Sequence, residues 1–455
     1  MASGTLIPLY QGVEHTAASP PKNELGYPSS INSVGWRWES PAGSHILRVW
    51  PTSGGVTALV GENKAVDGVI GLDSETGREV WRYRIPGRQI IANISGNGSN
   101  IFIEHEYRNL LDKGVKNMEL DSATGEILKE FSSSTEELNQ ENDSEDVLFT
   151  SYGQLFAGDG ERVLIRSESV PRSDDGYDWE YRSESGCEVD ATDRDEFMKS
   201  IRVISDVVLV PLNCSVPKRS DATEYDNPSK GHLVALDARD GQVKWDYTWD
   251  SVKDQARGLA SISIGSDGST VRVYDYLQYA RDQFSDNPVH SILDLETGEP
   301  INEHIGPFSG PQVVDFDASV IVLRDQAASA YSLIRAKNHE LLGKTQSNSE
   351  PQDQTKPTLL SESLVVPSVD PQSEEHTAPR AGVDSVTVYS KANPDEPPTS
   401  IELEPGSVLL PQGEERIMIK APGALIVGSN SPSTENSDGA LYSNYPTALI
   451  GLVNR

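Results

Sequence analysis

The two cysteines, Cys187 and Cys214, are the side chains best able to form a covalent bond with each other. Their spacing matches neither the Cys-x-x-Cys pair of redox proteins nor the ligand pairs of a zinc site. Two interpretations stay open: two independent buried thiols, or one disulfide in an exported protein. So few cysteines in a polar, Ser-rich, acidic chain favour the disulfide, because oxidising compartments preserve such bonds. Closing that loop would stabilise the fold by about 3 kcal/mol.

The eight histidines are scattered, and no His-x-His or His-x-x-x-His pair occurs among them. A metal centre built from remote histidines is the alternative to dispersed surface residues, and we assign no metal to them. Two acid-containing turns, Ala157–Glu161 and Gly265–Ser269, lack the full spacing of a calcium-binding loop. We interpret both as hairpin turns, with weak calcium binding as the alternative.

Motifs for hydrolysis and phosphoryl transfer are absent from the sequence. No Gly-x-Ser-x-Gly elbow, phosphate-binding Gly-rich loop or dinucleotide fingerprint occurs. Carboxylate pairs such as Glu136-Glu137 and Glu414-Glu415 resemble the pairs of glycosidases, but in a chain with 70 Asp and Glu residues such pairs arise by chance. The sequence therefore predicts no catalytic residue.

A repeated turn is the informative pattern. Leu-Asp-x-x-x-Gly occurs four times, and Trp follows the Gly by four positions in two of the copies. The Asp accepts hydrogen bonds from amides a few residues on, and the Gly adopts the positive φ of a tight reversal. Each copy therefore predicts a strand, a turn and a strand. The residues expected to organise these turns are Asp73, Gly77, Trp81, Asp121, Gly125, Asp237, Gly241, Trp245, Asp294 and Gly298.

Weaker copies bring the number of repeats to eight. They are Asp175–Tyr181, Tyr331–Asn338 with Asn338 at the Gly position, Val386–Ser390 and Ala448–Val453. A period of about 50 residues built of short strands predicts four-stranded antiparallel sheets arranged around an axis, a β-propeller. Seven blades is the alternative count, because the copy near residue 390 is weak. A two-domain all-β protein of sandwiches is the alternative fold.

The last repeat lacks its final strand, because the chain stops at the turn of the eighth copy. Thr5–Tyr10 is an apolar segment of strand length with no other assigned place. We expect this segment to pair with the C-terminal blade and close the ring. Residues 1–35 are then an N-terminal arm that contains the closing strand 5–10, and residues 36–455 form the propeller.

Leu236–Trp245 and Gly71–Trp81 resemble the quinoprotein-type, or pyrroloquinoline-quinone-like, β-propellers. In that family Asp-x-x-x-Gly-x-x-x-Trp spans the third and fourth strands of each blade, and the Trp packs between neighbouring blades. Two copies match fully, whereas Lys129 and Asn302 replace the Trp in two others. The resemblance extends over residues 36–453 as a spacing pattern. The family contains quinone-dependent dehydrogenases and non-enzymatic members, among them outer-membrane assembly lipoproteins and other cell-envelope scaffolds.

The resemblance also supplies a test for dehydrogenase chemistry. The large enzymes of the family carry two adjacent cysteines beside the quinone, a Trp floor and a calcium site of Asp, Glu and Asn near a catalytic Asp. Cys187 and Cys214 are not adjacent, so the most recognisable part of that cofactor site is missing. We therefore expect no cofactor and no enzyme activity. Smaller sugar-oxidising propellers use single His and Arg residues, which a sequence alone does not place.

The charge balance restricts the partners. The formal net charge is -32, with 38 Lys and Arg residues against 70 acidic ones, so a nucleic-acid partner is excluded by repulsion between like charges. No apolar stretch approaches the roughly 20 residues of a membrane span. Four polar insertions stand out, and they are Ser132–Asp146, Ser183–Glu196, Pro217–Lys230 and Ser368–Gly382. They are either solvated loops or a face for a cationic partner or divalent ions, and adaptation to high salt would also produce such a surface.

These observations favour a non-catalytic, monomeric, exported cell-envelope propeller that binds a protein or another envelope ligand. Met1–Gly4 lacks the pattern of a signal peptide, so we expect any signal or anchor segment to be absent from this chain. One alternative is a quinone-dependent or sugar-active oxidoreductase with its site in the central channel. Another is a cell-wall polymer module that uses Tyr177, Trp179 and Tyr181, although packing within its blade is the expected role of Trp179.

Overall fold

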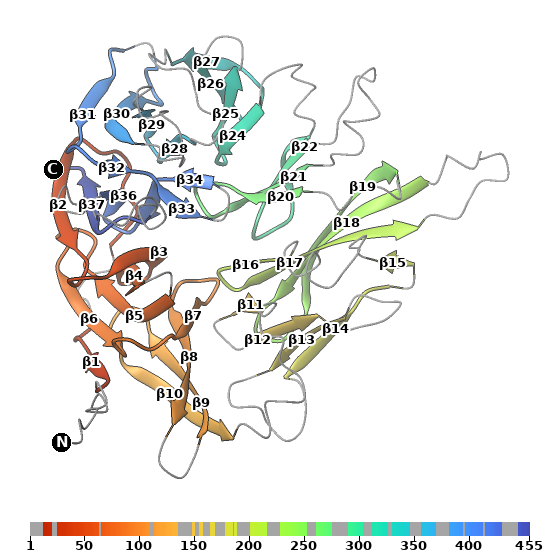
Figure 1. The fold of residues 1–455 in the computed structure, drawn as a ribbon. Helices are drawn as coiled ribbons and strands as arrows, with labels where there is room; N and C mark the ends of the chain where they lie inside the picture. The colour runs from red at the N-terminus through yellow and green to blue at the C-terminus, as the bar shows by residue number, and fades with distance from the viewer. Residues whose placement is uncertain are drawn as a thin grey trace, which may run out of the picture.

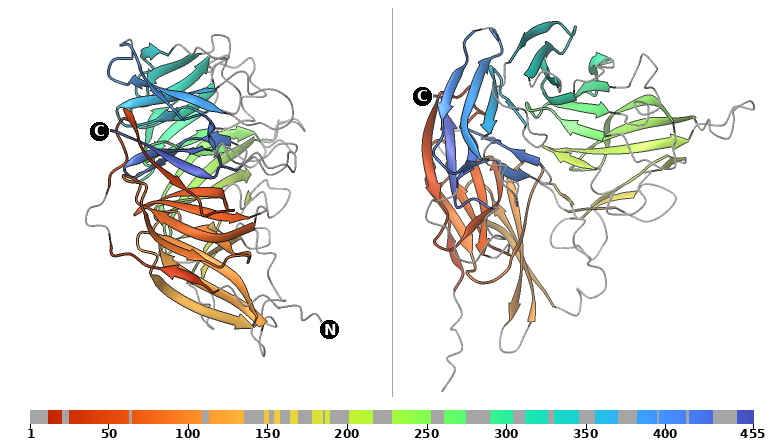
Figure 2. Two further views of the ribbon diagram at one scale, coloured as in Figure 1. Left: turned by 60° about the vertical axis from the view of Figure 1, so that its left-hand side comes forward. Right: turned by 45° about the horizontal axis from the view of Figure 1, so that its top comes forward.

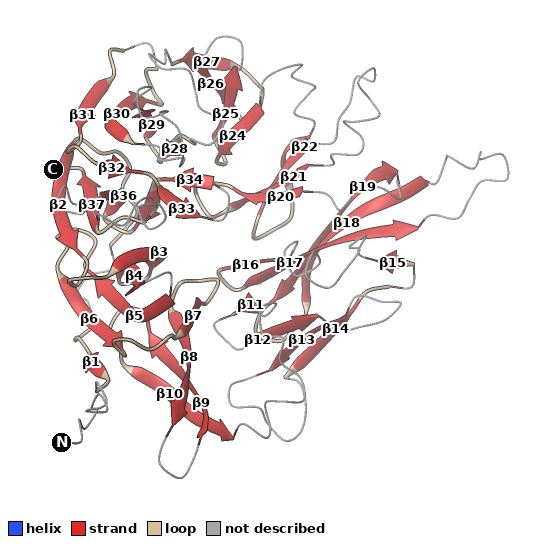
Figure 3. Ribbon diagram, viewed as in Figure 1, coloured by secondary structure: helices blue, strands red, loops and turns tan. Residues whose placement is uncertain are grey.

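The fold is taken from a computed structural model of the chain. The structure describes residues 12–20, 25–62, 65–108, 113–134, 148–150, 154–157, 164–168, 178–184, 186–188, 201–215, 228–252, 261–274, 290–303, 312–325, 330–345, 356–369, 382–394, 396–412, 415–429 and 445–455. These residues form strands, turns and loops without a helix (Figure 3). No helix that could cross a membrane therefore occurs in this part of the chain.

Eight antiparallel sheets of four or five strands occur in the described residues, and each sheet is one blade. Blade 1 contains β1 (Glu14–Thr16), β3 (His45–Thr52), β4 (Gly55–Glu62), β5 (Ala65–Leu72) and β6 (Glu79–Arg84), and blade 2 contains β7 (Ile91–Ile94), β8 (Asn100–Arg108), β9 (Lys113–Asp121) and β10 (Ile127–Ser134). Blade 3 contains β11 (Leu148–Phe149), β12 (Gln154–Ala157), β13 (Leu164–Glu168) and β14 (Trp179–Arg182). Blade 4 contains β15 (Cys187–Glu188), β16 (Arg202–Ile204), β17 (Val207–Ser215), β18 (Pro228–Asp237) and β19 (Val243–Val252).

Blades 5 to 8 follow the same plan. Blade 5 contains β20 (Ser261–Ile264), β21 (Thr270–Tyr274), β22 (His290–Asp294) and β23 (Pro300–Glu303), and blade 6 contains β24 (Gln312–Phe316), β25 (Val320–Asp325), β26 (Ala330–Arg335) and β27 (Leu341–Lys344). Blade 7 contains β28 (Thr358–Leu359), β29 (Ser363–Val369), β30 (Val383–Ser390) and β31 (Thr399–Glu402). Blade 8 contains β32 (Ser407–Val408), β35 (Ile419–Ala421), β36 (Ala424–Ser429), β37 (Ala448–Val453) and β2 (Ser33–Glu39). The short hairpin of β33 (Leu410–Gln412) and β34 (Glu415–Ile417) lies in the chain between β32 and β35.

The blades follow one another around a ring, from the red β3 through the green β17 to the blue β30 and back to β2 (Figure 1). Two further views show the same succession of sheets (Figure 2). The hydrophobic cores lie between successive blades. One cluster joins blades 8 and 1 through Trp36, Ile70 and Ile426, and another joins blades 4 and 5 through Leu233 and Leu293. The fold is thus an all-β propeller with the predicted antiparallel blades of at least four strands, and the described residues form eight of them, the expected number.

Closure of the ring by an N-terminal strand is confirmed, but the strand is not the expected one. β2 pairs with β37 in antiparallel register, so that Trp38 lies opposite Leu449. Because β36 occupies the other edge of β37, β2 is the missing fourth strand of blade 8. Thr5–Tyr10 lies outside the described residues, and the edge that it was expected to occupy belongs to β2. The propeller thereby includes Ser33, which precedes its expected start at residue 36.

The Leu-Asp-x-x-x-Gly turns join the third strand of a blade to the fourth, as the family pattern implies. They follow β5, β9, β18 and β22. In the degenerate copy after β26 the expected Asn338 is not at the Gly position. His339 has the positive φ, 57°, and its amide donates to the carbonyl oxygen of Arg335 over 3.0 Å. The amide of Gly77 likewise donates to the oxygen of Asp73 over 2.7 Å, so His339 corresponds to Gly77.

Candidate functional site

The geometry that recurs in the repeat begins with the Asp side chain. Asp73 Oδ1 accepts hydrogen bonds from the amides of Glu75 and Thr76, at 3.1 and 2.9 Å, and from Thr76 Oγ1 at 2.8 Å. Gly77 then turns the chain with a φ of 69°. Asp121 and Asp294 form the same contacts with the residues that follow them. Each such turn is a compact, hydrogen-bonded loop between the third and fourth strands of its blade.

A tryptophan of the preceding blade packs on this turn and donates a hydrogen bond to one of its carbonyl oxygens. Trp36 Nε1 donates to Ser74 O over 2.6 Å, and Trp81 Nε1 donates to Ser122 O over 3.0 Å. The same contact joins Trp179 to Ala238 O at 3.1 Å and Trp245 to Leu295 O at 2.8 Å. The turn glycine lies against the ring in all four. A Cβ atom there would approach the ring to between 2.4 and 2.7 Å at Gly77, Gly125, Gly241 and Gly298.

The structure therefore regroups the residues expected to organise the blades. Asp73 and Gly77 belong with Trp36 of blade 8, whereas Trp81 of their own blade reaches forward to the turn of Asp121 and Gly125. By the same rule Asp237 and Gly241 receive Trp179, and Asp294 and Gly298 receive Trp245. Each of these indole hydrogen bonds thus joins one blade to the next.

Trp36 was missed by the sequence argument, although a signal for it exists. Each docking Trp is followed two residues later by another aromatic side chain. The four copies are Trp36-Arg-Trp38, Trp81-Arg-Tyr83, Trp179-Glu-Tyr181 and Trp245-Asp-Tyr247. This pattern marks the fourth strand of a blade, and it would have identified Ser33–Glu39 as the closing strand.

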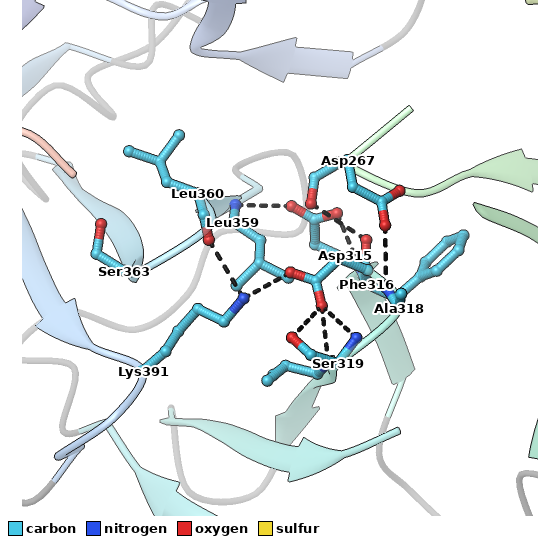
Figure 4. A network of polar contacts seen from close by, with 12 residues as sticks. Asp267, Asp315, Phe316, Ala318, Ser319, Leu359, Leu360, Ser363 and Lys391 are labelled. Atoms are coloured by element: carbon cyan, nitrogen blue, oxygen red, sulfur yellow. Dashed lines mark hydrogen bonds and ion pairs between the residues drawn. The ribbon is translucent and has the colours of Figure 1, made fainter. Parts of the chain in front are cut away.

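A cluster of charged side chains joins blades 5, 6, 7 and 8 on the face of the ring that carries the Asp-x-x-x-Gly turns. We call it the charged cluster, and it consists of Asp267, Asp315, Asp317, Lys391 and Lys420. Figure 4 shows its central part, in which strand-end carboxylates meet backbone amides and an ammonium group. The sequence singled out Asp267 alone, as part of the turn Gly265–Ser269, and did not predict the cluster, because its members come from four different blades.

Each member of the charged cluster bonds to another blade. Asp267 Oδ2 accepts from the amide of Ala318 over 3.0 Å, and Asp315 Oδ2 accepts from the amide of Leu359 over 2.8 Å. Lys391 Nζ lies 2.6 Å from Asp317 Oδ2. Lys420 Nζ donates to Ser266 O over 2.6 Å, which connects blade 8 to blade 5. The cluster therefore fastens four blades together at one face.

Burial and charge act differently on the members of this cluster. Burial raises the pKa of Asp315 to about 7, against the opposing effect of the amides of Leu359 and Phe316 and of the Lys420 charge. Burial would also raise the pKa of Asp317, but the hydrogen bonds from Lys391 and Ser319 outweigh it and hold that pKa below its usual value. Burial lowers the pKa of Lys420. Asp315 therefore titrates near neutral pH.

The disulfide between Cys187 and Cys214 is present, with an S–S distance of 2.03 Å. It links β15 to β17, where the two cysteines lie directly opposite each other. His232 Nδ1 lies 3.8 Å from Cys214 Sγ. In the part of the chain that the structure describes, these three residues are the one group with the donor spacing of a metal site, and the disulfide engages both of its sulfur atoms.

Two other sequence expectations fall on turns. Gly265–Ser269 is a hairpin turn between β20 and β21, in which Asp267 Oδ1 accepts from Thr270 Oγ1 over 2.8 Å and from the Ser269 amide over 3.0 Å. Gly268 has a φ of 67° there. The turn Ala157–Glu161 lies outside the described residues after Ala157. Most of each acidic insertion also lies outside them.

Comparison with known proteins gives one family. The family model described as outer membrane protein assembly factor BamB matches residues 32–340, which is more than half of the chain. No curated protein matches the sequence significantly. Among solved structures, BamB from Moraxella catarrhalis is 13% identical with a TM-score of 0.41, covering 92% of this chain and 98% of that one. Kluyveromyces lactis Hsv2 is 9% identical with a TM-score of 0.36, covering 81% and 98%. The dihydro-heme d1 dehydrogenase NirN is 10% identical with a TM-score of 0.37, covering 86% and 78%.

Proposed function

The chain belongs to the family described as outer membrane protein assembly factor BamB, and we propose that it is a non-catalytic scaffold of the cell envelope that binds a protein partner. The family description names an assembly factor of the outer membrane, and this description supports a protein-binding role. The composition agrees with this class, because the sequence lacks the adjacent cysteines of the quinone enzymes.

The placement of the four polar insertions is the observation that carries this proposal. Ser132–Asp146 and Ser183–Glu196 follow the fourth strands β10 and β14, whereas Pro217–Lys230 and Ser368–Gly382 join second strands to third strands. Successive connections of an antiparallel sheet alternate between its two ends. All four insertions therefore join strand ends at one face of the ring, opposite the Asp-x-x-x-Gly turns. We call this face the insertion face.

The two faces differ in how their polar groups are used. We call the face that carries the Asp-x-x-x-Gly turns the turn face. On this face, the indoles and the charged cluster form hydrogen bonds and ion pairs between blades. The insertion face receives the two most acidic insertions, Ser132–Asp146 and Ser183–Glu196, each of which contains six Asp and Glu residues. Clustered charge of one sign attracts a partner of the opposite sign and accelerates its association. We therefore propose that the partner presents a basic surface to the insertion face.

Trp179 does not have the exposure that binding of a cell-wall polymer would require. Trp179 is buried, with 7% of its surface exposed, and its indole is bonded to Ala238 O. A glycan-binding platform needs an exposed aromatic face, and this ring is covered by the turn of Gly241.

Charge reversal on the two faces tests the proposed function. The full chain is immobilised and incubated with a solubilised bacterial envelope extract, once as wild type and once with Glu136, Glu137 and Glu141 changed to Lys. We expect bound envelope proteins that elute with salt and that the triple variant loses. The matched control changes Glu75, Glu296 and Glu299, which are exposed in turns of the other face, to Lys. Equal loss in both variants would contradict a role for the insertion face. An absorbance band on addition of quinone would favour the oxidoreductase instead.

A further inference from the structure

Four side chains form a row across one face of blade 4. The Cys187–Cys214 disulfide is followed by His232, whose Nδ1 lies 3.8 Å from Cys214 Sγ, and by Asp246, whose Oδ2 lies 3.0 Å from His232 Nε2. The residues come in order from β15, β17, β18 and β19, so the row crosses the whole sheet.

The strand register places these side chains together. Cys214 pairs with Lys230, and Leu212 pairs with His232, so Cys214 and His232 are diagonal neighbours on the same face. His232 and Asp246 are related in the same way, because Asp246 pairs with Val234. Diagonal neighbours in an antiparallel sheet are within reach of long side chains. The long pairing of β17, β18 and β19 holds Cys214, His232 and Asp246 in place without any contribution from the disulfide.

The hydrogen bond to Asp246 fixes which ring nitrogen of His232 is free. A carboxylate only accepts hydrogen bonds, so Nε2 carries the proton that points to Asp246. In the neutral ring Nδ1 then has an unprotonated lone pair directed toward Cys214 Sγ. Histidines that ligate metals have this arrangement, in which the second nitrogen donates to a carboxylate that orients the ring.

We propose that reduction of the Cys187–Cys214 disulfide turns this row into a site for a divalent transition metal of the zinc class. The ligands are the thiolates of Cys187 and Cys214 and Nδ1 of His232, with Asp246 orienting the imidazole. A dithiol donates two electrons and two protons to the S–S bond and becomes a disulfide itself, which leaves two thiols. The metal ion then displaces both thiol protons to solvent as the two metal–sulfur bonds form.

The distances suit a tetrahedral centre. Zinc bonds of about 2.1 Å to nitrogen and 2.3 Å to sulfur separate the ligand atoms by about 3.5–3.8 Å. Cys214 Sγ and His232 Nδ1 already have that separation. Only Cys187 Sγ must move, and its backbone is anchored independently, because its amide donates to Glu184 O and its carbonyl oxygen accepts from Ser183 Oγ. Three protein ligands leave the fourth position to water.

The site is shielded but reachable. Cys187 is buried beside Tyr181 and Leu212, which belong to the same apolar cluster. The side chain of His232 is 18% exposed and that of Asp246 is 57% exposed, so an ion can enter from the Asp246 end of the row.

Cobalt and zinc titrations of the full chain test the proposal. The protein is reduced with dithiothreitol, freed of it by anaerobic gel filtration, and titrated with Co²⁺ and then Zn²⁺. We expect one ion per chain, thiolate-to-cobalt charge-transfer bands and intense visible bands of a tetrahedral centre, all bleached by Zn²⁺. The oxidised protein should show none of these bands. An identical cobalt spectrum before and after reduction, or a reduced protein without charge-transfer bands, would overturn the proposal.

Two variants separate a built site from loose binding by free thiols. Asp246→Asn keeps every ligand and, since Asp246 is exposed, the fold, and it should weaken Zn²⁺ binding by roughly 10- to 100-fold. His232→Gln should weaken it further and change the visible cobalt bands. His15→Gln, on β1 of blade 1, is the matched histidine control and should bind as the wild type does. Unchanged affinity in both His232→Gln and Asp246→Asn would show that the thiols bind the ion without the row.

Discussion

The indole nitrogen of Trp36 lies 2.6 Å from the carbonyl oxygen of Ser74, and this hydrogen bond joins the closing strand to blade 1. The same contact joins Trp81 to blade 2, where the chain runs directly from one blade to the next. The ring closure between blades 8 and 1 therefore uses the contact that joins consecutive blades, although Trp36 comes from the N-terminal strand β2 and the rest of blade 8 from the C-terminal part of the chain.

Removal of that hydrogen bond should loosen the closure. Trp36→Phe keeps an aromatic ring but leaves Ser74 O without its indole donor in a buried place, so we expect a loss of about 1–3 kcal/mol in the free energy of unfolding. Urea denaturation measures it. Val34→Ala on the same strand removes an exposed side chain and should change stability by less than about 0.5 kcal/mol. Equal stabilities of the two variants would contradict a role for the indole bond.

Two glycines with nearly equal, positive φ angles distinguish the cost of backbone strain from the cost of steric crowding. Gly241 and Gly268 have φ values of 69° and 67°. A Cβ at Gly241 would lie 2.4 Å from the Trp179 ring, whereas nothing lies within 4 Å of one at Gly268. Gly268→Ala should therefore cost about 1 kcal/mol from backbone strain alone, and Gly241→Ala several kcal/mol, because the indole must also move. Thermal denaturation of both compares them, and a smaller loss at Gly241 would refute the docking argument.

The architecture was predictable because its signal is local and repeated. Asp73 and Gly77 specify a turn through their own side-chain and backbone properties, and four such turns at a regular period define the propeller. The closing strand was assigned to Thr5–Tyr10 because that segment is apolar. Ser33–Glu39 owes its place to Trp36 and Trp38, whose spacing matches the other fourth strands.

Details that depend on several segments were not predictable. His339 adopts the positive φ expected of Asn338, because the turn is counted from Arg335, which has no Asp side chain to mark it. The charged cluster assembles from blades 5 to 8, so no spacing along the chain brings Asp315 near Lys420. The disulfide was anticipated from composition, whereas the His232–Asp246 pair beside it depends on the register of β18 and β19.

The pH dependence of stability should carry the signature of Asp315. Its pKa is raised to about 7 in the folded protein, above the value near 4 of an unfolded chain. Between these values the folded state holds a proton that the unfolded state has released, so this group's contribution is full below pH 4, declines as pH rises and is lost above pH 7. Asp315→Asn removes the titration. Relative to wild type, the variant should gain stability from pH 5 to pH 8 in thermal unfolding, and a constant difference would disprove the shift.

The ion pair between Asp317 and Lys391 should show strong coupling. Both side chains are 9% exposed, and the Nζ–Oδ2 distance is 2.6 Å. Lys391→Met leaves a buried carboxylate without its cation, so we expect a loss of about 3–5 kcal/mol. Adding Asp317→Asn to that variant should recover part of the loss, because the uncompensated charge is gone. A double-mutant cycle by urea denaturation measures the coupling.

The exposed pair of Arg335 and Glu340 provides the control for that cycle. Its charged atoms lie 3.2 Å apart, but the side chains are 51% and 59% exposed, so solvent screens their attraction. We expect a coupling of about 0–1 kcal/mol there. A coupling at Asp317 and Lys391 as small as that of the exposed pair would mean that this ion pair adds little to the joining of blades 6 and 7. A large coupling would instead show that this pair stabilises the contact between blades 6 and 7 on the turn face. The insertion face, on the opposite side of the ring, would then remain available to the proposed partner.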